Sequence, residues 1–190
     1  MILKRLTEVA HQYIGQVLKE GDYAVDATVG NGKDTEFLAR KVGENGKVYG
    51  FDIQDLAIEK TLKNLKEKNL EMRVKLIKDG HENLLKHIDR PVKVIMFNLG
   101  YLPGSDRKII TKPESTIKAI EDGLKVLLPG GLISIICYYG HAGGIEEKDF
   151  VLDYVKNLDG SKYTVLYYSY INKKNDPPIL ILIEKNSCKI

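Results

Sequence analysis

The sequence predicts an α/β fold in which a seven-stranded, mostly parallel sheet ends in an antiparallel hairpin. Two observations support this prediction. Short apolar runs alternate with helix-length amphipathic segments up to residue 157, and strands joined through such helices pack in parallel by right-handed crossovers. The last two runs, 163–171 and 179–183, have no helix between them, so we expect them to pair antiparallel.

The first part of the chain contains five predicted elements. Apolar side chains recur at helical spacing over residues 3–19, which predicts an amphipathic opening helix. A short buried strand follows at 23–26 and a helix at 34–42. The strand at 47–51 precedes a long helix whose apolar positions run over 56–65.

The second part continues the alternation. We expect strands at residues 73–77, 92–97 and 132–137. The last helix is expected at 146–157. A helix at 114–128 is expected to stop at Pro129-Gly130-Gly131, since proline cannot continue a helix and glycine weakens one. Alternating β/α units closed by a hairpin are typical of the Rossmann-like class I methyltransferase fold, whereas dehydrogenase Rossmann sheets stay parallel.

Length and composition bound the class of protein. With 190 residues, 43% hydrophobic and 29% charged, the chain fits one soluble globular domain over 1–190. Its helix at 1–20, with His11, folds over a ligand as a lid or simply packs on the sheet. No apolar run approaches the roughly 20 residues that cross a bilayer, so we expect no membrane partner and a cytoplasmic protein. The net charge of +3 permits a nucleic-acid partner without requiring one.

The strongest local signal follows the first predicted strand, where glycines lie between Asp26 and Thr35. Glycines let the main chain approach a ligand closely, and Asp52, at the end of the next strand, can accept both hydroxyls of a ribose. Thr35 stands where a dinucleotide fingerprint needs its third glycine, which favours S-adenosylmethionine over a pyrophosphate-bearing cofactor. The alternative is a glycine-rich turn that binds nothing. The expected cofactor residues here are Asp26, Thr28, Gly30, Asn31, Gly32, Asp34, Thr35, Asp52, Ile53 and Gln54.

The third strand ends at a second group of candidate cofactor residues, Asp79, Gly80 and His81. In this kind of fold a side chain at that place lies beside adenine, and Asp79 can accept a hydrogen bond from the exocyclic amine. Alternatively, Asp79 caps a helix that begins near His81. His81 itself is expected to stack, to form a hydrogen bond or to fill space.

The fourth strand ends in Asn98-Leu99-Gly100-Tyr101-Leu102-Pro103-Gly104, which is similar to the Asn-Pro-Pro-Tyr loop of amino-group methyltransferases. In that loop the asparagine oxygen accepts a hydrogen bond from the target nitrogen, and the aromatic ring stacks on a flipped base. Here Leu99 and Gly100 replace the two prolines. We expect Asn98 and Tyr101 to be catalytic, with Asn98 also beside the cofactor. The alternative is a turn with a packed tyrosine. The expected substrate contacts are Leu99, Gly100, Tyr101, Leu102 and Pro103.

Two further loops are expected at the same cleft. Tyr139 and His141 follow the fifth strand, and His141 can take a proton or bind a phosphate, unless it is an ordinary loop histidine. Loop 104–113 carries Asp106, a candidate proton acceptor. It also carries Arg107 and Lys108, which can meet RNA phosphates or simply be solvated.

The cysteines narrow the chemistry. Cys137 and Cys188 lie far apart and form no Cys/His cluster, so no metal is expected. Methylating carbon 5 of a pyrimidine requires a cysteine nucleophile. Neither cysteine is well placed for this, because Cys137 lies in an apolar strand and Cys188 in the tail. A nitrogen or oxygen nucleophile needs only positioning and a proton acceptor, since a sulfonium methyl is already activated.

Together these residues resemble the rRNA methylase family of small bacterial proteins, over nearly the whole chain. The shared motifs are 26–35, Asp52-Ile53-Gln54, Gly80-His81, 98–104 and Tyr139-Gly140-His141. The resemblance implies an S-adenosylmethionine-dependent enzyme whose partner is transfer RNA. Its implied substrate is 5-aminomethyl-2-thiouridine at the wobble position, converted to the 5-methylaminomethyl form.

Other functions remain open at this point. Ribosomal RNA or another amine could be the acceptor. A nicotinamide-dependent oxidoreductase would share the opening βαβ unit, but the missing third glycine and the terminal hairpin oppose it. A non-catalytic module that binds S-adenosylmethionine or RNA could lack Asn98 and Tyr101, and both are present. The oligomeric state is open, with a homodimer as one alternative.

Overall fold

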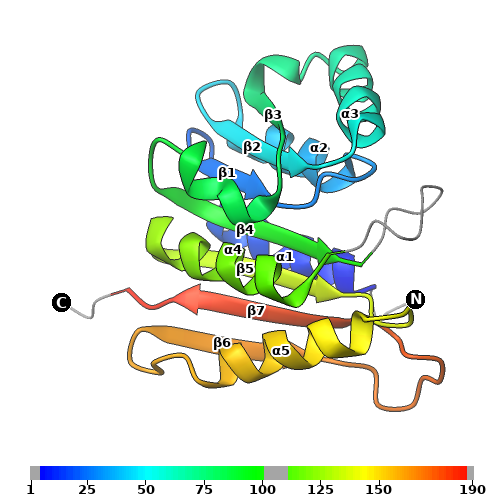
Figure 1. Ribbon diagram of the computed structural model, residues 1–190. Coiled ribbons are helices and arrows are strands. Elements are labelled where there is room, and N and C mark those ends of the chain that lie inside the picture. Colours follow the sequence, from blue (N-terminus) through cyan, green and yellow to red (C-terminus); the bar gives the residue numbers. More distant parts are fainter. Residues whose placement is uncertain (1–4, 101–110, 188–190) are drawn as a thin grey trace.

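The computed structural model describes residues 5–100 and 111–187, in which seven strands form one sheet (Figure 1). The strand order is β3-β2-β1-β4-β5-β7-β6. The bounds are β1 Tyr23–Asp26, β2 Lys47–Asp52, β3 Val74–Lys78, β4 Val92–Leu99, β5 Leu127–Cys137, β6 Tyr163–Tyr168 and β7 Ile179–Lys185. The first five strands run parallel, and β7 is antiparallel to both β5 and β6. The predicted fold class is confirmed.

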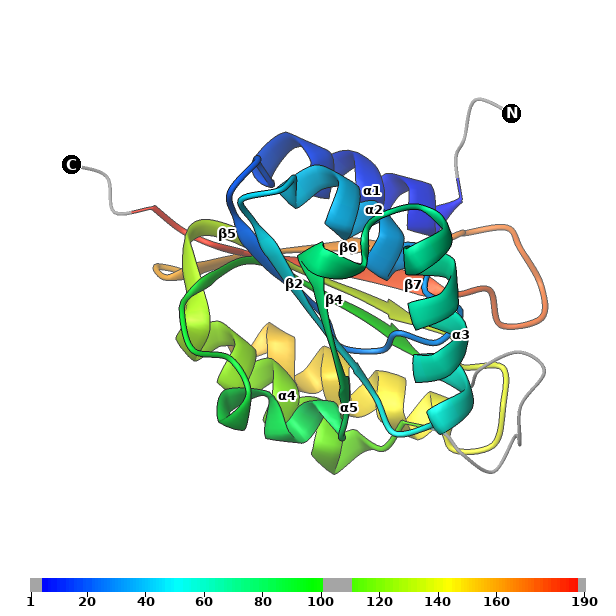
Figure 2. The ribbon, with the colours of Figure 1, turned by 90° about the horizontal axis from the view of Figure 1, so that it is seen from above.

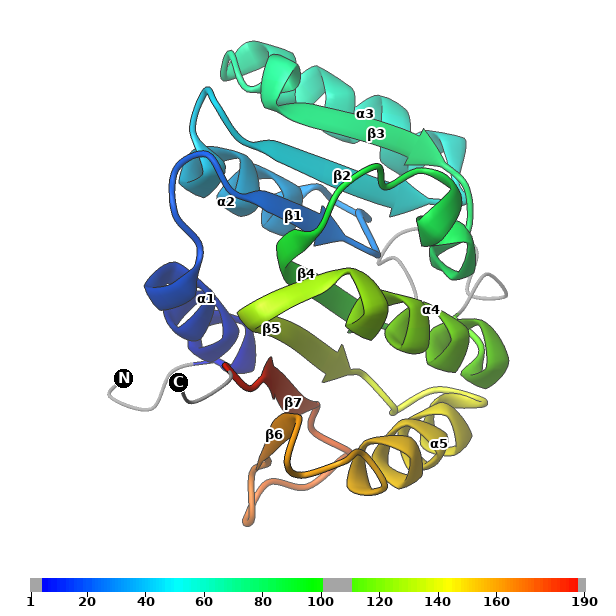
Figure 3. The ribbon, with the colours of Figure 1, turned by 90° about the vertical axis from the view of Figure 1, so that its left-hand side faces the viewer.

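Helices cover both faces of the sheet (Figures 2 and 3). Their bounds are α1 Leu6–Val17, α2 Lys33–Val42, α3 Asp55–Glu67, α4 Pro113–Val126 and α5 Gly144–Lys156, with short 3₁₀ turns η1 Glu71–Arg73 and η2 His81–Lys86. Helices α1, α2 and α3 share one hydrophobic core, and α4, α5 and η2 share the other. Neighbouring strand residues enter opposite cores, as Ala24 and Val25 do, because side chains alternate along a strand.

The predicted end of the fourth helix is wrong. Helix α4 ends at Val126, and β5 begins directly at Leu127 and includes Pro129-Gly130-Gly131. The pairing of β5 with β4 shifts register between Val92 and Val94, so the proline and glycines lie in a bulge inside the strand. Gly130 has a φ of 65°, a conformation that glycine adopts without strain.

Smaller differences concern element ends. Arg73 belongs to the 3₁₀ turn before β3, β6 stops at Tyr168 instead of residue 171, and β7 continues to Lys185. The opening helix is shorter than predicted. Its residues Leu6, Ala10 and Ile14 are buried on the sheet in the core shared with α2. A lid movement of this helix stays a prediction.

Within the part of the chain that the structure describes, no helix is both long enough and apolar enough to span a membrane.

Candidate active site

The candidate site residues gather where the parallel strands end. Asp26 ends β1, Asp52 ends β2, and Asn98 lies near the end of β4 (Figure 1). Strand β1 pairs with both β2 and β4, although β4 is distant in the chain. The order in which successive strands are added to the sheet therefore reverses between β1 and β4. In open α/β sheets, ligands bind at such a topological switch point.

Asp26 lies buried beneath the glycine-rich turn. Its Oδ2 accepts a hydrogen bond from the Thr35 hydroxyl at 2.6 Å, and its Oδ1 accepts one from the Thr28 main-chain N–H at 3.1 Å. Burial, and after it the nearby charge of Asp34, raise the pKa of Asp26 to about 7. Asp26 thus supports the turn from below.

Two separate causes favour glycine in this turn: the backbone conformation and the close approach of a helix. Gly30 and Gly32 have φ values of 50° and 73°, which favour glycine. A Cβ at Gly32 would lie 2.5 Å from the Thr61 hydroxyl of α3. Gly32 is therefore required by the close approach of a helix, a cause that the sequence pattern did not indicate.

Asp52 is held by the main chain in a half-exposed position. Its Oδ2 accepts from the Gly30 N–H and its Oδ1 from the Gln54 N–H, both at 2.9 Å. Each carboxylate oxygen keeps a further lone pair for another donor. Beside it, Ile53 is 55% exposed, and Asn31 accepts a hydrogen bond from Lys60 at 2.8 Å.

Both carboxylate oxygens of Asp79 form hydrogen bonds within the protein. Its Oδ1 accepts from the Gly80 N–H and from the Asn83 amide, both at 2.8 Å. Its Oδ2 contacts His87 Nε2 at 2.8 Å, and this bond is the main reason why the pKa of Asp79 is lowered. Gly80, not Asp79, occupies the position before the 3₁₀ turn. The adenine contact of Asp79 stays a prediction.

His81 is buried, with an exposed fraction of 7%. Its Nδ1 lies 3.2 Å from the Ala27 carbonyl, and its ring meets Phe97 edge-on at 5.8 Å between centroids. Burial lowers the pKa of His81, so the neutral ring donates from Nδ1 and offers Nε2 as an acceptor. Nε2 has no hydrogen-bond partner among the residues that the structure describes. A buried orphan nitrogen of this kind is satisfied by a ligand or water.

Asn98 is fixed at both its main chain and its side chain. Its N–H donates to the Thr28 hydroxyl at 2.7 Å, and its amide Nδ2 donates to Asp34. A carboxylate only accepts, so the amide nitrogen must face Asp34 and Oδ1 must face away from it. The other oxygen of Asp34 lies 2.6 Å from His11 Nε2, and the His11 ring stacks on Phe37 at 3.8 Å.

A buried polar network lies behind Gly100. The Gly100 N–H donates to the Thr111 hydroxyl at 3.0 Å, and the Thr111 N–H donates to the Gly100 carbonyl at 3.2 Å. The hydroxyls of Thr111 and Thr116 each donate to Glu147 at 2.6 Å. Glu147 is 3% exposed and lies in the first turn of α5, where the helix dipole favours a negative charge. Sequence reasoning missed these three residues, and no local pattern indicates them.

The ends of β4 and β5 are close together, as predicted. The Tyr138 N–H donates to the buried Leu99 carbonyl at 3.0 Å. A Cβ on Gly100 would lie 3.5 Å from His141 Nε2, and His141 Nδ1 contacts the Ala142 carbonyl at 3.0 Å. Six predicted site residues lie outside the described part of the chain: Tyr101, Leu102, Pro103, Asp106, Arg107 and Lys108.

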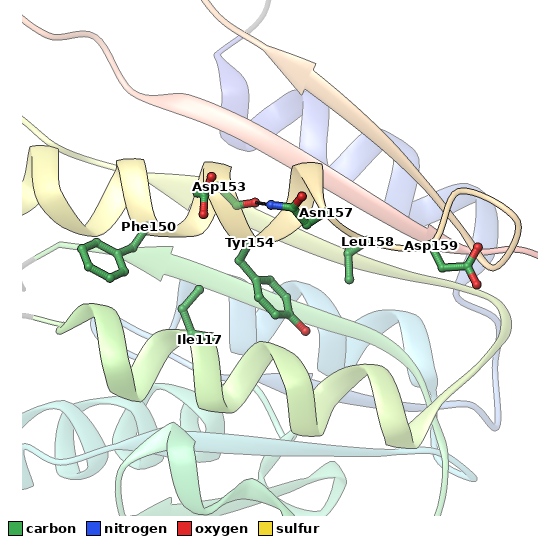
Figure 4. Close-up of a pocket in the computed structure, with 7 residues that line it drawn as sticks. All are labelled: Ile117, Phe150, Asp153, Tyr154, Asn157, Leu158 and Asp159. Carbon is green, nitrogen blue, oxygen red and sulfur yellow. Dashed lines mark hydrogen bonds between the residues drawn. The ribbon is translucent and has the colours of Figure 1, made fainter.

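A shallow groove lies between α4 and α5, on the face of the sheet that these two helices cover (Figure 4). It is lined by Ile117, Phe150, Asp153, Tyr154, Asn157, Leu158 and Asp159. None of the strand-end residues described above lines it. This groove is therefore separate from the candidate active site.

The strand-end residues fit an adenosyl cofactor. Asp52 has acceptor capacity for a ribose, and the unsatisfied His81 Nε2 can accept a hydrogen bond from a ligand. The carboxylates Asp34 and Asp52 both lie close enough to Asp26 to raise its pKa, and this concentration of negative charge suits a cationic sulfonium. Over residues 5–100 and 111–187, no three His, Cys, Asp or Glu side chains converge as metal ligands.

Cys137 is unsuited to nucleophilic chemistry. Its side chain is 2% exposed, and burial raises its pKa to about 12. The thiolate is the nucleophilic form of cysteine, and it is disfavoured at this position. Covalent activation of a pyrimidine ring by Cys137 is therefore opposed by the structure.

Comparisons with known proteins identify the family of the chain. Over residues 48–184 the chain matches the family described as "Putative rRNA methylase". It is 36% identical to the tRNA (mnm(5)s(2)U34)-methyltransferase, chloroplastic, of Arabidopsis thaliana, over 97% of this chain and 71% of that protein. It also resembles a crystal structure from Clostridium thermocellum described as a "putative rRNA-methylase", with 53% identity and a TM-score of 0.95, covering 96% of this chain and 98% of that one.

A further solved relative contains a cofactor product. A protein from Streptococcus mutans described as "a putative methyltransferase", in complex with SAH, is 43% identical, with a TM-score of 0.89, and the match covers 96% of this chain and 99% of that one. The predicted family, fold and cofactor are confirmed, and the oxidoreductase and non-catalytic alternatives are not supported. The chain belongs to the rRNA methylase family and is an S-adenosylmethionine-dependent methyltransferase.

Proposed function

We propose that this enzyme methylates the aminomethyl nitrogen of 5-aminomethyl-2-thiouridine at the wobble position of transfer RNA, giving 5-methylaminomethyl-2-thiouridine. The observation that carries the proposal is the fixed orientation of Asn98. Because Asp34 holds the amide nitrogen, Oδ1 faces away and can accept a hydrogen bond from an amine N–H. That contact aligns the nitrogen lone pair, which is the positioning that direct displacement requires.

The remaining roles follow from the predicted residues. The cofactor supplies an activated methyl group on a sulfonium. Asp52 binds the ribose, the turn at Gly30 and Gly32 lies beneath the methionine part, and Tyr101 packs on the uracil ring. An alkylamine is largely protonated near neutral pH and must lose a proton before it attacks. Asp106 and His141 are the proposed acceptors of that proton, with desolvation of the amine as the alternative.

One argument favours this substrate over ribosomal RNA, the acceptor that the family description names. The Arabidopsis relative bears the name of the transfer RNA activity. The inert thiol of Cys137 opposes methylation of a pyrimidine carbon and is consistent with an amine acceptor, although this does not separate the two kinds of RNA. Ribosomal RNA stays the second candidate. The cytoplasmic location, the single domain and the homodimer also stay predictions.

The decisive experiment compares acceptors. Transfer RNA that carries 5-aminomethyl-2-thiouridine should take up one methyl group, which mass spectrometry of its nucleosides will locate. The same transcript with plain uridine should take up none, because it offers no amine and its ring carbon needs a cysteine nucleophile. Equal methylation of the plain transcript, or labelling of ribosomal RNA alone, would overturn the substrate assignment.

A further inference from the structure

Tyrosines and lysines gather beside the end of β4. Tyr138 and Tyr139 follow β5, Tyr167 and Tyr170 lie at the end of β6 and just beyond it, and Lys148 and Lys173 accompany them. They form two groups at this end of the sheet: Tyr139, Tyr167 and Lys148 lie on the α5 side, and Tyr138, Tyr170 and Lys173 lie on the α1 side. We call the two groups together the tyrosine–lysine surface. The catalytic roles proposed above use none of them, and only Tyr139 is expected at the cleft from the sequence.

The sheet brings these segments together although they are distant in the chain. Cys137 pairs with Ile179 of β7, and Tyr168 pairs with the neighbouring Leu180, so the end of β5 and the end of β6 lie at one edge. The loops that follow them approach each other there, since a Cβ on Gly140 would lie 3.7 Å from Asp176 Cβ. In Figure 1 both loops lie at the same end of the sheet as the carboxyl ends of β1 and β4.

The surface reaches the candidate active site through Tyr138. A Cβ on Gly100 would lie 3.3 Å from Tyr138 Cβ. Burial raises the pKa of Tyr138, and the nearby charge of Asp34 raises it further. Asp34 is the carboxylate that holds Asn98.

Cations lie over two of the rings. Lys173 Nζ is 4.4 Å from the centroid of Tyr170, and Lys148 Nζ is 5.0 Å from the centroid of Tyr139. Lys148 also pairs with Asp149 at 2.7 Å, so part of its charge is balanced within the protein. Tyr138 and Tyr167 remain 42% and 52% exposed. Aromatic rings exposed beside lysines are the combination with which proteins bind unpaired nucleotides, because bases stack on the rings and phosphates meet the cations.

We infer that the tyrosine–lysine surface binds the single-stranded loop of an RNA next to the base that enters the active site. This inference rests on the proposed function and adds the partner-binding surface to it. The tyrosines stack on neighbouring unpaired bases, and Lys173 faces the phosphates. A loop, not a duplex, is the expected partner, since only unpaired bases offer their faces to a side chain.

The test measures binding of a fluorescent anticodon stem–loop RNA, and of a fully paired duplex, to the intact protein saturated with SAH. Tyr138→Ala and Tyr167→Ala should each weaken stem–loop binding about five- to a hundredfold, whereas Tyr138→Phe, which keeps the ring, should bind like the wild type. Lys173→Ala should lower the slope of log affinity against log salt by about one. The matched control is Lys75→Ala, which removes a lysine 5.8 Å from the Tyr49 ring at the other side of the sheet and should change nothing.

Unchanged SAH affinity will show that each variant is folded. Stem–loop binding by Tyr138→Ala and Tyr167→Ala at wild-type strength would overturn the inference, as would equal affinity for the duplex. These outcomes are separable from failure of the proposed function. If the wild type methylates the modified transfer RNA but the variants bind the stem–loop normally, only the surface is refuted. If binding depends on Tyr138 while no transfer RNA accepts a methyl group, only the substrate assignment is refuted.

Discussion

The two halves of the active-site edge are constructed differently. At the ends of β1 and β2, carboxylates accept hydrogen bonds from main-chain N–H groups two residues away, as Asp26 does from Thr28 and Asp52 does from Gln54. At the ends of β4 and β5, side chains from distant segments hold one another. Asn98 reaches Asp34, 64 residues away, and Thr111 reaches Glu147, 36 residues away.

This difference indicates what each half contributes. Main-chain donors form a fixed cradle that suits a cofactor with constant chemistry. Side-chain networks set the orientation of single polar groups. The rate of methyl transfer depends on that orientation more strongly than the affinity for the cofactor does. We therefore expect substitutions in the first half to alter cofactor affinity and those in the second half to alter turnover.

The sharpest test of this division is Asn98→Ala. Turnover should fall by about two orders of magnitude or more, because the acceptor that aligns the nucleophile is lost. Affinity for S-adenosylmethionine should stay within about threefold of the wild type, measured by calorimetry. A variant that keeps its turnover would show that the loop after β4 is not the catalytic centre.

The matching substitution in the other half is Asp52→Ala. It should weaken binding of S-adenosylmethionine by about tenfold or more, since two charge-assisted hydrogen bonds to the ribose are removed. At saturating cofactor, turnover should recover most of its wild-type value. Calorimetry that finds unchanged affinity in a folded variant would contradict the placement of the ribose at Asp52.

Thr111→Val examines the buried network. The variant keeps the shape of the side chain but leaves the Gly100 N–H and one oxygen of Glu147 without their partner. We expect the free energy of unfolding to drop by about 1–3 kcal/mol in urea titrations, with turnover reduced as well. Thr164→Val is the control, because the Thr164 hydroxyl bonds Asn186 at an exposed position. Equal stability losses in both variants would argue against a special role for the network.

The same contrast explains what could be predicted from the sequence. The alternation of strands and helices and the terminal hairpin were recognisable, because apolar periodicity and turn residues are local signals. Asp26 and Asp52 were recognisable because their setting is local too. The bulge at Pro129-Gly130-Gly131 could not be predicted, because proline and glycine also commonly end helices. Glu147 was missed because its partners are brought to it only by the packing of α4 and α5.

Asp26→Asn should change how the stability of the protein depends on pH, because the carboxyl group of Asp26 is buried. The pKa of Asp26, about 7, lies above its ordinary value of 3.8, so the folded protein keeps a proton that the unfolded chain has lost between these values. Wild-type stability should therefore fall as the pH rises through that window and level off above it. The variant lacks this loss, so its stability relative to the wild type should be higher at about pH 8 than at about pH 5 in urea titrations. A difference that does not change with pH would contradict the raised pKa.

The smallest expected effect concerns α1, which belongs to the core yet contacts the site through His11. His11→Phe keeps a flat ring to stack on Phe37 but removes the hydrogen bond to Asp34. Asp34 would still hold Asn98, so turnover should fall only a few-fold, by about the factor that one lost hydrogen bond of 0.5–1.5 kcal/mol implies. Cofactor affinity should be unchanged, and the free energy of unfolding should fall by no more than about 0.5–1.5 kcal/mol, because one hydrogen bond is lost while the apolar face of α1 stays intact. If affinity for S-adenosylmethionine falls and turnover does not, His11 belongs with the cofactor half, and the helix covers the cofactor instead of orienting Asn98.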